Sequence, residues 1–134
     1  MGHRLVRACD PGPKNALGLV KFIFPNHFDV YLHDTPSRSL FNKAHRALSH
    51  GCIRVENPVG LVQYVLRDQP QWTTARIAAA MNGQQEQTAM LKEHLPVHIG
   101  YWTAWVNPDG SVTYTDDPYK PDQKQAQLEQ LSAE

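Results

Sequence analysis

The sequence predicts a mainly β fold with a few short helices. Short runs of aliphatic, β-branched and aromatic residues are bounded by Pro, Gly, Asn and Asp, which is typical of strands separated by turns. Two segments instead place apolar residues at helical spacing behind a capping side chain, at Asn57 and Thr73. With 134 residues, the chain has room for one hydrophobic core but not for two ordinary domains, so we expect a single domain.

The first part of the chain is expected to contain two short strands and a long loop. An apolar run predicts a strand near residues 18–24, and a β-like run over 29–33 places His33 at a strand end. Residues 34–49 are polar apart from one apolar pair, Leu-Phe. We therefore expect a surface loop that is pinned by one apolar contact, and long loops of this kind are often functional.

Two short helices are expected in the middle of the chain. Asn57 can cap the first helix, and Pro58 suits its first position. The second helix is expected over 73–81, with a threonine cap at its start and Asn82-Gly83 at its end. Residues 86–91 fit either a third helical turn or a strand.

A β-hairpin is expected near the C-terminus. The run over 97–106 is the strongest strand signal in the chain, and the turn residues of 107–110 lead it into a second run over 111–115. We expect this hairpin to anchor the sheet. Residues 120–134 are rich in glutamine and form a polar tail, expected to be a marginal helix or a frayed end.

Composition narrows the classes of partner. Lys and Arg number 13, as do Asp and Glu, so no net charge would attract nucleic acid, an anionic membrane or an acidic polymer. No segment is apolar enough to span a bilayer, and no run of signal-peptide length follows Arg4 and Arg7. Two cysteines are too few for a disulfide framework, although one bridge between Cys9 and Cys52 stays open. We favour a reduced Cys52.

Cys52 is a candidate nucleophile. It follows Gly51, which allows a sharp turn that would expose the sulfur beside backbone N–H groups. A free thiol has a pKa of about 8.5 and needs a base or a positive neighbour, for which His33 and Arg54 are the candidates. A histidine suits proton transfer because its unperturbed pKa, about 6.5, lies near neutral pH. On this pattern alone, a buried and inert Cys52 explains the sequence at least as well.

The spacing of these residues makes the pattern specific. Fifteen residues separate His33 from the segment Ser49-His50-Gly51-Cys52-Ile53-Arg54. This arrangement resembles the signature of the YkuD-type L,D-transpeptidases, which is a histidine, a spacer of about this length, and a Ser/Thr-x-Gly-Cys core followed by Arg or Asn. The resemblance implies an acyltransferase with a cysteine nucleophile.

The resemblance extends over most of residues 11–119. Residues 15–18 and 32–36 are similar to the lead-in strands of this family, and 101–106 with 109–110 resemble the closing hairpin of its larger periplasmic branch. It implies a YkuD-like β-sandwich with a catalytic domain over 1–119. Members of this branch carry further strands before the segment that corresponds to residues 15–18, so we expect the sheet to be incomplete at its start and its exposed edge to lower stability.

By this resemblance, Cys52 attacks the carbonyl of meso-diaminopimelate, the third residue of a peptidoglycan stem peptide, and expels the terminal D-alanine. The resulting thioester is resolved by an acceptor amine, either on another stem peptide, which gives a 3-3 cross-link, or on a lysine of a wall-anchored lipoprotein. His33 takes the thiol proton and later the amine proton. The resemblance also implies a periplasmic or cell-envelope location and reaction with carbapenems, and it implies no cofactor.

Backbone groups are assigned to the site in the same way. The N–H groups of Gly51 and Cys52 would form the oxyanion hole, whose donors are each worth several kcal/mol in the transition state. The carbonyl of Asp34 would orient the imidazole.

Three further side chains are expected near the substrate. Arg54 would hold a substrate carboxylate or brace the nucleophile loop, with an ordinary surface ion pair as the alternative. Ser49 would form a hydrogen bond within the turn, and a purely local role is about equally plausible. His50 is expected to line the site.

Three other functions remain as alternatives. An L,D-carboxypeptidase would resolve the thioester with water, and a non-catalytic wall-binding remnant would keep only the fold. A zinc site built from His33, His50 and Cys52 is weaker, because no pair of them has a common zinc-ligand spacing.

Overall fold

The structure is a computed structural model that describes residues 4–7, 15–49 and 51–125. The chain divides into two compact units, Met1–Val97 and His98–Glu134. The first unit contains a five-stranded sheet and two α-helices, and the second contains a two-stranded sheet. The predicted mainly β fold with short helices is therefore confirmed in its coarse features.

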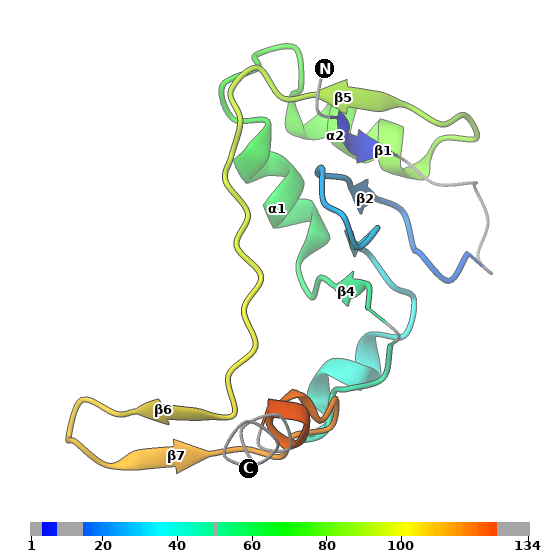
Figure 1. Cartoon of the computed structure of the whole chain (residues 1–134). Helices are drawn as coiled ribbons and strands as arrows, with labels where there is room; N and C mark the ends of the chain where they lie inside the picture. The colour runs from blue at the N-terminus through cyan, green and yellow to red at the C-terminus, as the bar shows by residue number, and fades with distance from the viewer. Residues whose placement is uncertain (1–3, 8–14, 50, 126–134) are drawn as a thin grey trace. The chain divides into compact units, whose positions relative to one another are not determined.

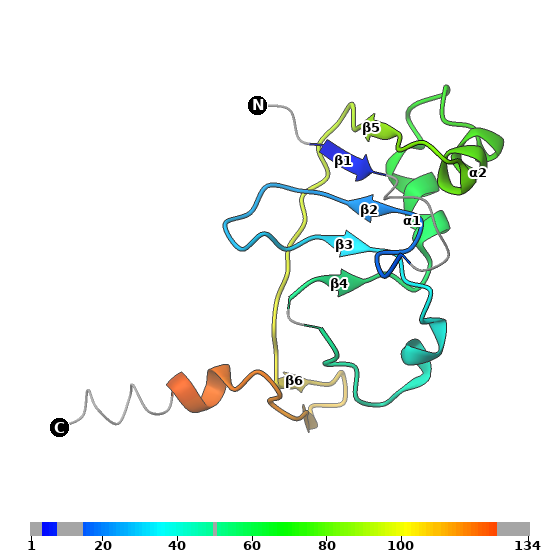
Figure 2. The same cartoon turned by 90° about the vertical axis from the view of Figure 1, so that its right-hand side faces the viewer.

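The sheet of the first unit has the strand order β4-β3-β2-β1-β5 (Figure 2). All neighbouring strands are antiparallel except β3 and β4, which run parallel. The strand bounds are β1 Arg4–Arg7, β2 Lys21–Phe22, β3 Leu32–His33, β4 Ile53–Arg54 and β5 Thr88–Met90. Both strands expected between residues 18 and 33 are present but shorter, and residues 86–91 contain a strand rather than a helical turn.

Strand β1 was not predicted from the sequence. It lies between β2 and β5 and pairs with both, Arg7 opposite Lys21 on one side and Val6 opposite Ala89 on the other. Its place depends on two partners that are distant in sequence.

The predicted β-sandwich stays a prediction, as does an incomplete start of the sheet.

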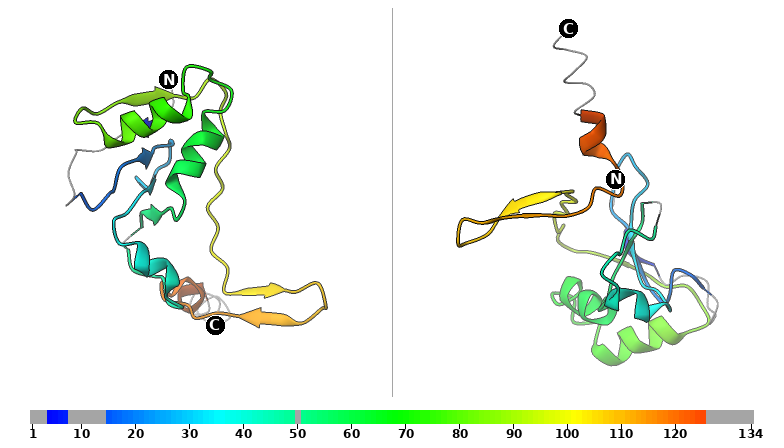
Figure 3. Two further views of the ribbon diagram at one scale, coloured as in Figure 1. Left: turned by 180° about the vertical axis from the view of Figure 1, so that it is seen from behind. Right: turned by 90° about the horizontal axis from the view of Figure 1, so that it is seen from below.

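Two helices pack on one side of this sheet (Figures 1 and 3). Helix α1 covers Pro58–Val65 and α2 covers Thr74–Asn82. The Asn57 side chain accepts a hydrogen bond from Gly60 N at 2.9 Å, and the Thr73 hydroxyl accepts one from Arg76 N at 3.2 Å. Both predicted helix starts are therefore confirmed.

The core lies between these helices and the sheet. Buried side chains from α1, α2, β2, β5 and the residues that directly adjoin them form one cluster, and Leu32 and Val55 pack against it. Its buried members are Val20, Phe22, Val62, Leu66, Ile77, Met81, Ala89 and Leu91. Successive side chains of a strand point to opposite faces, so Lys21 and His33 lie on the face opposite to Phe22 and Leu32. The sheet thus uses one face for the core and leaves the other for a site.

The polar stretch over 34–49 forms a loop, as expected. It contains a short 3-10 helix, η1, over Arg38–Asn42. Leu40 and Phe41 are half-buried while most of their neighbours in the loop are exposed. The apolar contact that was expected to pin the loop stays a prediction.

The second unit contains the expected hairpin, made of β6 Ala104–Val106 and β7 Val112–Tyr114. Asn107 N donates to Ser111 O at 2.8 Å, and Gly110 takes a φ of +83°, as a tight turn requires. The Ser111 hydroxyl and backbone N–H donate to the Asp109 carboxylate, and these bonds lower the pKa of Asp109.

Two expectations for this region were wrong or incomplete. The hairpin forms its own two-stranded sheet and does not anchor the five-stranded sheet, and residues 97–103 are not strand. Their β-branched and aromatic side chains favour an extended chain, but a strand also needs a hydrogen-bonded partner. Residues 121–125 are helical, and the rest of the predicted tail lies outside the described residues.

We expect Asn57→Ala to lower the free energy of unfolding by about 1 kcal/mol, because it removes the side-chain acceptor at the N-terminus of α1. Asn57→Asp keeps an acceptor at this position and should remain close to the unsubstituted protein. Urea denaturation of the three proteins provides the comparison. Equal midpoints for Asn57→Ala and Asn57→Asp would contradict the assigned cap.

Candidate active site

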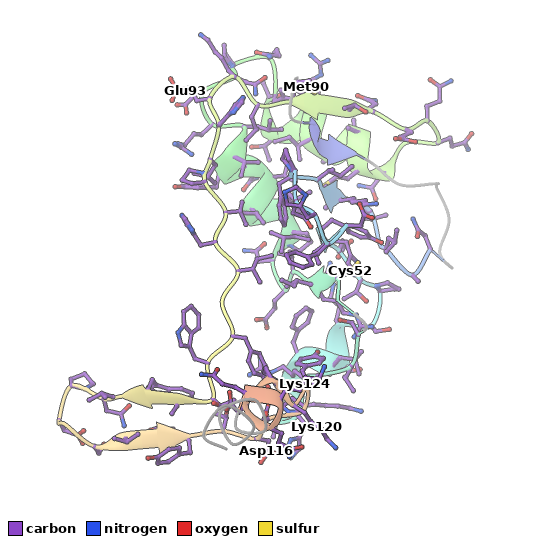
Figure 4. All side chains as sticks on the ribbon, in the orientation of Figure 1. Cys52, Met90, Glu93, Asp116, Lys120 and Lys124 are labelled. Carbon is purple, nitrogen blue, oxygen red and sulfur yellow. The ribbon has the colours of Figure 1, made fainter. Side chains whose placement is uncertain are left out.

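The parallel pairing of β3 with β4 brings the predicted base next to the predicted nucleophile loop. Ile53 N donates to Tyr31 O at 3.0 Å, and Val55 N donates to His33 O at 2.8 Å. In this register His33 lies opposite Arg54. Cys52 lies one residue before β4 (Figure 4), and alternation back from Arg54 predicts that its side chain faces the same side as His33.

The turn before Cys52 needs a glycine. Gly51 has a φ of +147°, in a region that is essentially restricted to glycine. The Ser49 hydroxyl donates to Cys52 O at 2.7 Å, and Gly51 N lies 3.5 Å from the same hydroxyl. Ser49 therefore fixes the backbone of the turn, which agrees with the hydrogen bond expected of it.

Cys52 itself is half-buried and carries a free thiol. Its backbone N–H has no hydrogen-bond partner among the residues that the structure describes. His50 and Cys9 lie outside the described residues.

The His33 ring is buried and has a defined hydrogen bond. Only 5% of the residue is exposed, and Nδ1 lies 2.5 Å from Asp34 O. A carbonyl oxygen only accepts, so Nδ1 carries the proton of this bond and Nε2 of the neutral ring keeps a lone pair. The Tyr31 ring lies beside the imidazole, with centroids 5.8 Å apart. The ring is therefore held in a tautomer whose Nε2 can accept a proton.

Asp34 is held by its side chain as well as its backbone. The residue is 3% exposed, and its carboxylate accepts from Leu19 N at 2.8 Å, Thr35 N at 2.7 Å and Arg38 Nη2 at 2.5 Å. Its backbone N donates to Val20 O at 2.9 Å. These bonds fix the peptide whose carbonyl accepts the hydrogen bond from His33 Nδ1.

Two cations flank His33 on its face of the sheet. Lys21 lies opposite His33 across β2 and β3, and its ammonium lies 3.5 Å from the centroid of the Tyr31 ring. Arg54 lies opposite His33 across β3 and β4, and within the described parts of the chain its guanidinium has no hydrogen-bond or ion-pair partner. This face therefore offers positive charge to an anionic ligand.

Sequence reasoning did not single out Lys21, Tyr31 or Arg38. Lys21 enters the site through its register opposite His33, whereas Tyr31 lies two residues before His33 and reaches the same face by strand alternation. The spacing Asp34-x-x-x-Arg38 directly after the predicted base was the one available signal for Arg38.

The described residues contain neither a metal-binding cluster nor a membrane-spanning helix. Among residues 4–7, 15–49 and 51–125, no group of three or more His, Cys, Asp or Glu side chains could hold a metal ion. The zinc alternative also required His50, so the structure does not test it. Within the same ranges, no helix has the length and apolar character needed to cross a membrane.

Comparisons with known proteins agree with this geometry. The model of the YkuD family, described as the L,D-transpeptidase catalytic domain, matches residues 2–99. A protein of Haemophilus influenzae, provisionally named an L,D-transpeptidase, is 37% identical over 110 residues, which is 82% of this chain but 22% of that protein. The chain thus spans about a fifth of the length of that relative. The resemblance seen in the sequence is confirmed, and the chain belongs to the YkuD family of L,D-transpeptidase catalytic domains.

Proposed function

We propose that the chain is an L,D-transpeptidase that acts through a thioester on Cys52, with His33 as general base. The main support is the parallel pairing of β3 with β4, which sets the turn at Gly51-Cys52 beside a buried histidine. The bond from His33 Nδ1 to Asp34 O leaves Nε2 as the proton acceptor. A thiol, a nearby base and a group that orients the base form the usual set for nucleophilic catalysis.

In the proposed acylation step, the stem peptide is transferred to Cys52. His33 Nε2 takes the proton from the Cys52 thiol, and the thiolate attacks the carbonyl of the third stem-peptide residue, meso-diaminopimelate. The oxyanion that forms is stabilised by the N–H groups of Cys52 and Gly51. The Cys52 N–H has no other partner in the described structure, whereas the Gly51 N–H has only the long contact to Ser49. The imidazolium then returns its proton to the leaving amine of D-alanine.

The acceptor resolves the thioester by the same proton route. His33 takes a proton from an amine, which attacks the thioester carbonyl and releases Cys52. An amine on another stem peptide gives a 3-3 cross-link, and a lysine of a wall-anchored lipoprotein gives an attached protein. Attack by water would instead make the enzyme an L,D-carboxypeptidase. These substrates place the activity in the periplasm or cell envelope.

Arg54 is the proposed binding group for a substrate carboxylate. It lies beside His33 across the parallel pair, and no described residue engages its guanidinium. A guanidinium can bind a carboxylate with two parallel hydrogen bonds. Diaminopimelate carries a free carboxylate on its side chain, so it suits such a group.

A carbapenem tests the nucleophile. We expect the protein to gain the mass of one intact carbapenem, because the thiolate opens the lactam and keeps the acyl group. Cys52→Ala should gain no mass, whereas Cys9→Ser should react like the unsubstituted protein. Intact-protein mass spectrometry reads the result. A folded protein that stays unmodified, or a Cys52→Ala variant that still reacts, would rule out the assignment.

A disaccharide-tetrapeptide tests the reaction. We expect a cross-linked dimer together with free D-alanine, identified by mass spectrometry. His33→Gln should lower the rate at least about 100-fold, because general-base catalysis contributes that much or more. Tripeptide without dimer would favour the carboxypeptidase, and the absence of any product from folded protein would contradict both enzymes.

Substituting Arg54 tests carboxylate binding. We expect Arg54→Gln to lower kcat/KM for the tetrapeptide donor about 10-fold or more, since a hydrogen bond to a charged group is worth about 1.5–3 kcal/mol. A donor with an amidated diaminopimelate side chain is the control, because it lacks the carboxylate and should react equally with both proteins. Equal losses on both donors would show that Arg54 braces the loop instead.

A further inference from the structure

We infer that Arg38 is a positioning residue that couples the general base to the nucleophile by joining the two ends of the loop between them. The inference rests on the proposed function, because it requires His33 and Cys52 to act together. Arg38 Nη2 donates to Asp34 Oδ1 at 2.5 Å, and Nη1 donates to Glu56 O at 2.6 Å. Asp34 directly follows the base, and Glu56 lies two residues after β4, the strand that directly follows the nucleophile.

The Asp34 end of this bridge controls the imidazole. The carboxylate that Arg38 contacts belongs to the residue whose carbonyl accepts the hydrogen bond from His33 Nδ1. Leu19 N and Thr35 N hold the same carboxylate, so it cannot shift without moving its peptide. Gly18, at a φ of +64°, packs so closely against this carboxylate that a Cβ at Gly18 would overlap it. A displacement of the Asp34 side chain is therefore transmitted to the ring of His33.

The Glu56 end of the bridge holds β4, the strand that directly follows the nucleophile. Val55 N, next to Glu56, donates to His33 O in the parallel ladder. Asn57, on the other side of Glu56, caps α1. The Glu56 carbonyl thus lies between the end of the ladder and the start of a packed helix. A guanidinium that donates a hydrogen bond to this carbonyl is therefore held at a fixed place relative to β4.

Arg38 suits this role by its chemistry and its surroundings. A planar guanidinium holds two acceptors in a fixed relation, which a lysine ammonium does not do in the same geometry. An exposed ion pair contributes little to stability, but here the Asp34 carboxylate is buried, with 4% of its side chain exposed against 48% for Arg38. The two loop ends are thus linked through one rigid group. Arg54, by contrast, keeps its guanidinium for a ligand.

The loss of this link should slow chemistry more than binding. A misplacement of reacting groups by about 1 Å can cost about 100-fold in rate. We expect Arg38→Gln to lower the first-order rate constant of carbapenem acylation about 10- to 100-fold, while the carbapenem concentration that gives half the maximal rate changes little. Arg46→Gln is the matched control, because it removes a cation from the same loop, and in the described structure the Arg46 side chain has no hydrogen-bond or ion-pair partner.

A spectroscopic readout separates positioning from stability. The Nδ1 proton of His33 should give a slowly exchanging, downfield NMR signal in the unsubstituted protein and in Arg46→Gln, since it is bonded within a buried site. In Arg38→Gln this signal should shift or broaden. Rates are divided by the folded fraction measured by circular dichroism. Arg38→Lys keeps the charge beside Asp34 and provides the milder variant if Arg38→Gln does not fold, with an expected rate between those of Gln and Arg.

The outcomes distinguish this inference from the proposed function. A slower acylation step with an altered His33 signal, at an unchanged half-saturating concentration, supports the coupling. Equal rates and an unchanged signal in Arg38→Gln, or a full rate in Arg38→Lys when only that variant folds, overturn the coupling and leave the proposed function standing. A folded, unsubstituted protein that carbapenem does not modify overturns both.

Discussion

The parallel contact between β3 and β4 is the constraint on which the rest of the site depends. It contains only two residue pairs, Leu32 with Ile53 and His33 with Arg54. Parallel neighbours also require a crossover connection, and here the loop that contains η1 provides it. A ladder this short cannot hold its register by backbone hydrogen bonds alone. The hydrogen bonds of the Ser49 and Asp34 side chains therefore add to the ladder in holding the two strands in register.

Features that depend on a few adjacent residues could be predicted from the sequence. The caps at Asn57 and Thr73 and the turn before β7 require only neighbours within four positions, and all three are present. Strand β1 and the strand order could not be predicted, because they depend on partners far along the chain. The strand expected over 97–106 is confirmed only for residues 104–106, which pair with β7, because residues 97–103 favour an extended chain but are not strand.

Some residues of the candidate site could likewise be predicted from the sequence, and others could not. Cys52 and His33 could be proposed from the sequence because their spacing resembles the family signature, and the positive φ of Gly51 agrees with the expected turn. The two hydrogen bonds of Arg38 could not be predicted together, because its second acceptor is a backbone carbonyl, that of Glu56, which lies 18 residues away. Lys21 enters the site only through its register opposite His33. The chemistry of a side chain can be predicted from the sequence, whereas a hydrogen bond to a distant backbone atom can be predicted only once the fold is known.

Under the proposed function, the arrangement of charge would allow a chain with no net charge to select an anionic substrate. Thirteen basic and thirteen acidic residues give no overall attraction, so recognition depends on where individual charges lie. Arg38 offsets the Asp34 carboxylate, the nearest buried negative charge to His33. Lys21 and Arg54 then leave the face around His33 positive. A stem peptide rich in carboxylates would meet local attraction at the point where its carbonyl must approach Cys52, and a neutral analogue would lose that attraction while keeping the reactive geometry.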